Sequence, residues 1–382
     1  MKPSRKSMFF NLLISTAALT IPSLMLTQTL LFAQNNQLSN PILTQTGREL
    51  KRDNNWSDIG KAEFIDANTA DRLIREFQAQ KKPEPTLELQ GKTDPEMEQL
   101  IAVRVSDGQT LEQKVARPRS QDTESSQSTV DNLATEEPPP LPSIVGSDDR
   151  KLYLDMQAYP HRTIGGIAPK GSTTSSCTGT LVGPRHVLTA GHCIHPGGGG
   201  KTKFYKDRGF APGWKGKGNT KATHPNGYYS PVHYFAPQGW INKGNSRYDY
   251  ALIVLENNSE LRQLGWLGTT NGNVGNLTQK SIINRGYPGS NLNCKASPIK
   301  SGPNKGKCFN YMYGMTGRGI AVGSFRFSHT ADVVGGHSGS PLFKSNNKIY
   351  GIHTQSGPVY SWAIKMRNGI QDMIHEAKDQ FE

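Results

Sequence analysis

Three short segments, far apart along the chain, together supply a histidine, an aspartate and a serine. Ser338 lies in GHSGSPL, with glycines two residues before it and one residue after it. His192 lies upstream in TAGHC, and Asp249 lies between the two in YDYAL. A serine hydroxyl is a poor nucleophile until an imidazole takes its proton and a carboxylate orients that imidazole. The three contexts together therefore predict a Ser–His–Asp triad.

The order of the triad restricts the fold. Histidine before aspartate before serine is the order of the chymotrypsin-type double β-barrel, whereas subtilisins and α/β-hydrolases order the same groups differently. From about Ser143 onward, short β-branched and apolar runs alternate with Gly, Pro and Asn turns, which is typical of an all-β domain. Near the end, Ile370, Met373, Ile374 and Ala377 fall at helical spacing. We therefore expect an all-β, chymotrypsin-like double β-barrel with a C-terminal helix.

Residues 1–33 have the features of a secretory signal peptide. Basic residues are followed by an apolar run, which ends in a small-residue cleavage site at Ala33. The length of the run leaves an uncleaved membrane anchor as the alternative, but interspersed polar residues lower its hydrophobicity. We expect cleavage, and hence a secreted protein, extracellular or periplasmic, without stable membrane insertion.

Residues 34–142 are interpreted as a largely disordered, acidic prosegment, and residues 143–382 as a trypsin-like serine protease domain. Within the prosegment, a short amphipathic helix is predicted over 69–80, with Leu73, Ile74 and Phe77 on one face. Residues 117–142 are rich in Ser, Thr, Gln and Glu and are expected to be disordered. Such an exposed stretch is a natural cleavage site.

The charge is divided unevenly between these parts. Residues 143–382 hold 28 Lys and Arg against 12 Asp and Glu, a net charge of +16, whereas residues 1–142 hold 16 against 19, a net charge of −3. Opposite charges on one chain favour an acidic prosegment that rests on a basic domain and inhibits it. The alternative is ordinary surface charge without specific docking.

All four cysteines lie after Ser143, and an even number in an exported chain favours disulfides. Four cysteines allow three pairings, of which we favour Cys177–Cys193 and Cys294–Cys308 because both close short, local loops. No CxxC pair is present, so a zinc site is not expected. We expect no metal ion and no cofactor.

From residue 143 onward the chain resembles the bacterial glutamyl endopeptidases, a branch of the chymotrypsin-like serine proteases. The motifs that carry the resemblance include SIVGSDDR at 143–150, CTG at 177–179, GYPG at 286–289 and GIHT at 351–354. The resemblance implies a secreted serine endopeptidase, made as an inactive zymogen, with its mature N-terminus near Ser143. It also supports the Cys177–Cys193 pairing.

The matched positions imply a role for each residue of the site. Ser338 would be the nucleophile, His192 the general base and acid, and Asp249 the group that orients the imidazole. The backbone N–H groups of Gly336 and Ser338 would form the oxyanion hole. Protein or peptide substrates and the chain's own prosegment are the expected partners.

The specificity pocket leaves two alternatives open. His353 matches the histidine that recognises the substrate carboxylate in glutamyl enzymes, and Ser356 could donate a hydroxyl to the same group. However, Val333 stands where relatives usually carry Thr or Ser, and Asp332 occupies the place that gives trypsin its preference for Arg and Lys. The sequence favours cleavage after Glu, or Asp, with a trypsin-like preference as the alternative.

A second alternative is a catalytically dead, protease-like secreted protein whose basic surface binds an anionic polysaccharide or nucleic acid. The sequence contains no recognisable zinc finger and no aromatic RNA-binding signature, so we do not expect nucleic acid as a partner.

Overall fold

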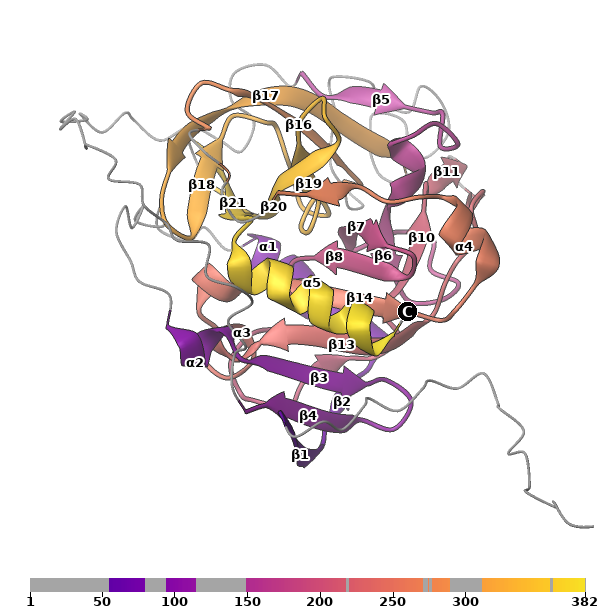
Figure 1. The fold of residues 1–382 in the computed structure, drawn as a ribbon. Helices are drawn as coiled ribbons and strands as arrows, with labels where there is room; N and C mark the ends of the chain where they lie inside the picture. The colour runs from indigo at the N-terminus through magenta and orange to yellow at the C-terminus, as the bar shows by residue number, and fades with distance from the viewer. Residues whose placement is uncertain are drawn as a thin grey trace, which may run out of the picture. The chain divides into compact units, whose positions relative to one another are not determined.

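Figure 1 shows the fold of the protein in a computed structural model, which describes residues 55–79, 94–114, 149–217, 220–270, 274, 277–288, 311–357 and 360–381. Every described residue belongs to one compact unit, within residues 45–382. The predicted signal peptide and the predicted disorder of 117–142 lie outside the described residues.

A first antiparallel barrel is built from six strands in the order β13-β14-β8-β7-β6-β10. A β-bridge between Phe210 of β10 and Tyr229, two residues before β13, closes the ring. Apolar side chains fill it, and the run ALIVL of β14 is buried at every position. The strands are β6 (Ile164–Ala168), β7 (Cys177–Gly183), β8 (His186–Thr189), β10 (Gly209–Pro212), β13 (Pro231–Pro237) and β14 (Ala251–Leu255).

A second barrel follows in the order β20-β19-β16-β17-β18-β21, and it closes because β20 also pairs with β21. All six of these pairings are antiparallel. The two barrels confirm the predicted all-β fold. The strands are β16 (Ser281–Gly286), β17 (Met312–Val322), β18 (Arg326–His329), β19 (Pro341–Phe343), β20 (Lys348–Ser356) and β21 (Ser361–Lys365).

Short elements connect and border the barrels. β5 pairs with β17, β15 runs parallel to β20, and β11 and β12 form a separate hairpin. These elements are β5 (Lys151–Tyr153), β11 (Lys215–Lys217), β12 (Thr220–Thr223), β15 (Gly268–Thr269), α3 (Gln238–Ile241), α4 (Ser259–Gln263), and the 3-10 helices η1 (His161–Thr163), η2 (Gly191–Cys193) and η3 (Ser246–Tyr248).

The predicted C-terminal helix is α5 (Asn368–Gln380). Its four apolar residues at helical spacing are buried, and Figure 1 shows the helix lying across the strands of the first barrel. The same spacing that predicted the helix therefore also identifies the face that packs. Phe381, directly after the helix, packs against His233 of β13 in a tilted arrangement, with the ring centroids 4.3 Å apart.

The described part of residues 34–142 is folded onto the first barrel. The predicted helix is confirmed as α1 (Ala67–Ala79). The strands were not predicted: β3 pairs with β13 over five residues, and β4 and β1 extend the sheet beyond it to nine strands (Figure 1). The remaining elements are α2 (Pro95–Glu98), β1 (Trp56–Lys61), β2 (Phe64–Ile65), β3 (Leu100–Arg104), β4 (Gln109–Gln113), and β9 (Phe204–Tyr205), which pairs with β2.

A buried ion pair joins this N-terminal part to the rest of the chain. Arg367, just before α5, donates from Nε to Glu98 Oε1 at 3.0 Å, and the Tyr250 hydroxyl donates to the other Glu98 oxygen. The guanidinium also lies over the rings of Tyr248, Tyr250 and Phe325, at 5.0 to 5.2 Å from their centroids. Removing one partner of a buried pair leaves an uncompensated charge, so Glu98 is a strong anchor for the N-terminal part.

Buried histidines make the stability of this fold depend on pH. Burial lowers the pKa of His233 to about 3, and neither of its ring nitrogens has a hydrogen-bond partner among the described residues. The unfolded chain takes up a proton below its ordinary pKa of about 6.5, whereas folded His233 stays neutral until about pH 3. The folded state therefore loses stability as the pH falls from 6.5 towards 3.

We predict that His233→Leu reduces this acid sensitivity. Between pH 7 and pH 5, one such histidine should cost about 2 kcal/mol of unfolding free energy. The difference between urea unfolding free energies at these two pH values should therefore be smaller by that amount in the variant. An equal difference in the two proteins would show that His233 is not held neutral.

Candidate active site

The predicted histidine and aspartate meet in a buried pair. His192 lies on η2, directly after β8, and its Nδ1 is 2.8 Å from Asp249 Oδ2. The backbone N–H of His192 donates to the other carboxylate oxygen, also at 2.8 Å. Both residues are almost fully buried. The carboxylate therefore fixes the orientation of the imidazole and favours the tautomer that carries its proton on Nδ1.

Ser338 lies on the loop before β19, and hydrogen bonds to both barrels hold this loop in place. The Thr178 N–H of β7 donates to the Ser338 carbonyl at 2.8 Å, and the Gly339 N–H donates to the His353 carbonyl of β20 at 2.7 Å. Gly339 has a φ of +84°, and a Cβ there would come within 2.1 Å of the Thr189 hydroxyl. Only glycine fits this turn.

Gly336 provides the site's backbone donor. Its φ is +97°, a conformation that favours glycine, and its carbonyl accepts a hydrogen bond from the Thr178 hydroxyl at 2.8 Å. Its N–H donates to the side-chain oxygen of Gln78 at 3.2 Å. The group predicted to bind an oxyanion therefore already binds an uncharged carbonyl oxygen from the N-terminal part.

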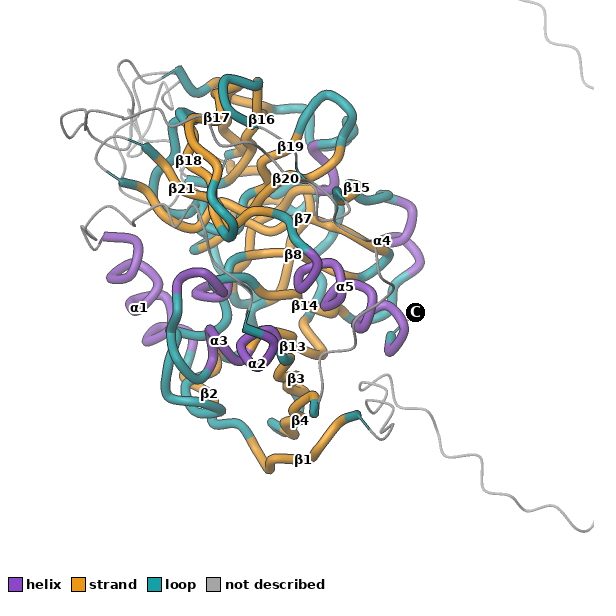
Figure 2. The backbone as a smooth tube through the Cα atoms, turned by 60° about the vertical axis from the view of Figure 1, so that its left-hand side comes forward, coloured by secondary structure: helices purple, strands orange, loops and turns teal. Residues whose placement is uncertain are grey.

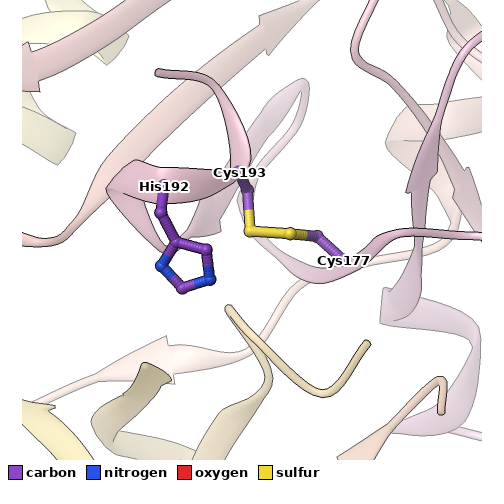
Figure 3. Close-up of side chains that lie close together, drawn as sticks. All are labelled: Cys177, His192 and Cys193. Atoms are coloured by element: carbon purple, nitrogen blue, oxygen red, sulfur yellow. A yellow bond between two sulfur atoms is a disulfide. The ribbon is translucent and has the colours of Figure 1, made fainter. Parts of the chain in front are cut away.

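A disulfide between Cys177 and Cys193 joins β7 to η2 next to His192, as Figure 3 shows. This pairing confirms one of the two predicted disulfides, whereas Cys294 and Cys308 lie outside the described residues. Cys177, His192 and Cys193 form the group of described residues whose ligand atoms lie close enough to hold a metal ion. Because the two sulfurs are bonded to each other, they are not thiolate ligands.

A small pocket opens beside Ser338. His353 and Ser356, both predicted for the specificity site, line it, whereas Asp332 and Val333 are not among its lining residues. Asp332 instead accepts a hydrogen bond from the Asp149 N–H at 3.0 Å, and Val333 is fully buried. The lining residues are Phe77, Gln78, Val334, Gly335, Ser338, His353, Thr354, Gln355 and Ser356.

His353 is neutral rather than a fixed positive charge. Burial, followed by the nearby His192, lowers the pKa of His353 to about 3. Its ring packs edge-on against His329 with the centroids 5.6 Å apart, and burial also holds the pKa of His329 well below its usual range. At neutral pH, His353 therefore carries no net charge, and one of its two ring nitrogens holds a proton.

Helix α1 brings two residues of the N-terminal part into this site. Phe77 stacks on the His192 ring with the centroids 4.3 Å apart, and Gln78 Nε2 donates to Ser338 Oγ at 3.1 Å. Figure 2 shows α1 on a different side of the barrels from α5. The amphipathic pattern predicted the helix and placed Phe77 on its apolar face. The role of Gln78 had no sequence signal, because a lone glutamine carries no spacing pattern.

Comparisons with known proteins agree with this architecture. Residues 177–352 match the family described as trypsin-like peptidase domain. The chain is 32% identical over 210 residues to a glutamyl endopeptidase of Bacillus licheniformis, covering 54% of this chain and 56% of the relative. It is 27% identical over 240 residues to a Bacillus subtilis protein named extracellular metalloprotease, covering 61% and 68% of the two chains.

A solved structure, of a Glu endopeptidase in complex with MPD, is 27% identical and has a TM-score of 0.50. It covers 62% of this chain and 100% of its own. The chain therefore carries a trypsin-like peptidase domain with a chymotrypsin-like fold. It is homologous to the glutamyl endopeptidases, as its motifs predicted, although it spans only 56% of the length of the Bacillus licheniformis relative. In the part of the chain that the structure describes, no helix is long and apolar enough to cross a membrane.

We predict that replacing Cys177 and Cys193 together by Ser lowers the free energy of unfolding. A disulfide that closes a loop of this size contributes about 3 kcal/mol, because it restricts the unfolded chain. Urea unfolding of the full chain measures the change. An unchanged urea midpoint would mean that the bond does not stabilise the fold.

Proposed function

We propose that this chain is the precursor of a secreted serine endopeptidase that cleaves peptide bonds through Ser338, His192 and Asp249. The buried pair of His192 and Asp249 carries the proposal, because it leaves Nε2 of a correctly oriented imidazole free to accept a proton. The serine loop, held by both barrels, brings the nucleophile to the same site.

In the proposed reaction, Ser338 Oγ attacks the carbonyl carbon of the substrate while His192 Nε2 takes the hydroxyl proton. The negative charge that develops on the carbonyl oxygen is stabilised by the N–H groups of Gly336 and Ser338. His192 then gives its proton to the leaving amine. Water next attacks the acyl group on Ser338 while His192 takes its proton, and His192 returns that proton to Ser338 as the product acid leaves. Asp249 stabilises the imidazolium in both halves of the reaction.

For specificity, we propose cleavage after Glu, or Asp. His353 and Ser356 line the pocket and can donate hydrogen bonds to a substrate carboxylate, which is costly to bury without partners. The trypsin-like alternative needs Asp332 in the pocket, and its hydrogen bond to the Asp149 backbone disfavours this. The name of the Bacillus licheniformis relative agrees with the glutamyl preference.

We propose further that residues 1–33 are a signal peptide and that residues 34–142 are a prosegment, removed by cleavage near Ser143. Three observations support an inhibitory role: Phe77 and Gln78 of α1 line the pocket, β3 pairs with β13, and Glu98 pairs with the buried Arg367. The complete set of His192, Asp249, Ser338 and Gly336 favours an enzyme over the catalytically dead binding protein.

Ser338→Ala should abolish hydrolysis and leave the fold intact. Loss of a triad nucleophile costs roughly 10⁶-fold in turnover, and a methyl group fits where the hydroxyl lies. The measurement is peptide hydrolysis by the protein after removal of its N-terminal part, with circular dichroism as the check on folding. Labelling of the wild-type serine by a fluorophosphonate should disappear in the variant. Retained hydrolysis would overturn the assignment.

His353→Ala should reduce cleavage after Glu while sparing cleavage after neutral residues. A lost hydrogen bond to a charged group costs roughly 10- to 100-fold. The products of a mixed peptide library, identified by mass spectrometry, give both rates in one experiment. A uniform loss at all cleavage sites would show that His353 has only a packing role. Cleavage after Arg or Lys by the wild-type protein would instead support the trypsin-like alternative.

A further inference from the structure

We propose that the side-chain carboxamide of Gln78 blocks the active site of the precursor, by occupying the hydrogen-bonding groups that a substrate's scissile amide would use. This inference rests on the proposed protease function and goes beyond it. It names one residue, and one set of bonds, through which the N-terminal part would inhibit the enzyme.

Each polar atom of the carboxamide has a partner in the site. Gln78 Oε1 accepts from the Gly336 N–H at 3.2 Å, which is the position expected for a substrate carbonyl oxygen. Gln78 Nε2 donates to Ser338 Oγ and to the Ser176 carbonyl, each at 3.1 Å. The absence of a side chain at Gly335 leaves room for the carboxamide, because a Cβ added there would lie 3.1 Å from the same Oε1.

Ser338 and its proposed base, His192, are not hydrogen-bonded to each other in the described structure. Ser338 Oγ receives a hydrogen bond from Gln78, while His192 Nε2 is buried with no hydrogen-bond partner among the described residues. Phe77 covers the face of the same imidazole in a stacked arrangement, with an angle of 23° between the rings. The hydrogen bonds between His192 and Asp249 are thus formed, whereas the bond expected between His192 and Ser338 is not.

The geometry also explains why the inhibitor is not a substrate. Gln78 lies one residue before the end of α1, so its backbone amides belong to a helix and not to an extended strand. A protease of this fold cleaves a backbone that pairs with a strand edge. What faces Ser338 Oγ is a side-chain nitrogen, which donates to the nucleophile instead of presenting a carbonyl carbon to it.

The helix is held independently of Gln78. Arg208, whose side chain is fully buried, donates from Nη1 to Asp71 at 2.6 Å and from Nη2 to the Ala67 carbonyl at 3.3 Å. On the same helix, Ala70 and Ile74 are fully buried. These contacts fix the first half of α1 on the barrel and carry Phe77 and Gln78 into the site. Replacing Gln78 should therefore leave the helix docked.

The test is the rate at which a fluorophosphonate labels Ser338 in the intact precursor, counted by mass spectrometry on the full-length chain only. Gln78→Leu keeps the size of the side chain and the helix, but removes its donor and its acceptor. Losing these three hydrogen bonds should raise the labelling rate roughly 10- to 100-fold. Gln78→Glu should also react faster, because a carboxylate oxygen would face the Ser176 carbonyl.

Asn68→Leu is the matched control, because it makes the same kind of change on an exposed side chain at the other end of α1. It should label at the wild-type rate. Thermal unfolding and hydrogen exchange of 67–79 show whether each variant stays folded with its helix docked.

The outcomes separate the two proposals. A Gln78→Leu precursor that labels no faster than wild type, while the cleaved protein labels readily, would overturn the role of Gln78 and leave the protease standing. So would a wild-type precursor that labels as fast as the cleaved protein. If even the cleaved protein does not react, the proposed function itself fails, and this inference fails with it.

Discussion

A carboxylate buried in a protein must have its hydrogen bonds supplied, and this requirement organises the candidate site. Asp249 is almost fully buried, and His192 gives it two bonds, one from the ring and one from the backbone. These bonds determine the orientation of η2, which the disulfide Cys177–Cys193 ties to β7. The bonds to Asp249 and the adjacent disulfide therefore both restrain the position of the imidazole.

The N-terminal part contacts only some of the hydrogen-bonding groups of the candidate site. It leaves the buried His192–Asp249 pair intact and contacts the groups that would exchange partners in the proposed reaction, the Ser338 hydroxyl and the Gly336 N–H. Breaking the buried pair would leave an uncompensated charge, whereas the hydroxyl and the N–H simply change one partner for another. An inhibitor that uses these bonds can be removed without rebuilding the site.

The sequence predicted what depends on local pattern or on motifs. The motif order indicated the double barrel, the spacing of Ile370 and Ala377 gave α5, and the apolar face around Phe77 gave α1. Short apolar runs such as 100–104 have no clear period, so the strands that extend the first sheet were missed. Pairings between distant residues, such as Glu98 with Arg367, have no signal in one sequence, because they depend on tertiary geometry.

The specificity pocket shows the same limit. Asp332 lies six residues before Ser338, as an Asp does in trypsin, but position along the chain does not determine which neighbour a carboxylate meets. In the fold it accepts a bond from the Asp149 backbone, at the start of the described protease domain. His353 and Ser356 both line the pocket, and both lie on β20, whose register is set by pairing with β19 and β21.

On the proposal above, α1 and a bound substrate compete for the same groups. Hydrogen exchange of residues 67–79 in the full-length chain, measured with and without a peptidyl boronic acid, tests this competition. We expect slow exchange in the free protein and faster exchange once the boronate is bound at Ser338, because its oxygen needs the Gly336 N–H that Gln78 occupies. Unchanged protection of this helix with the inhibitor bound at Ser338 would show that α1 and the inhibitor do not compete.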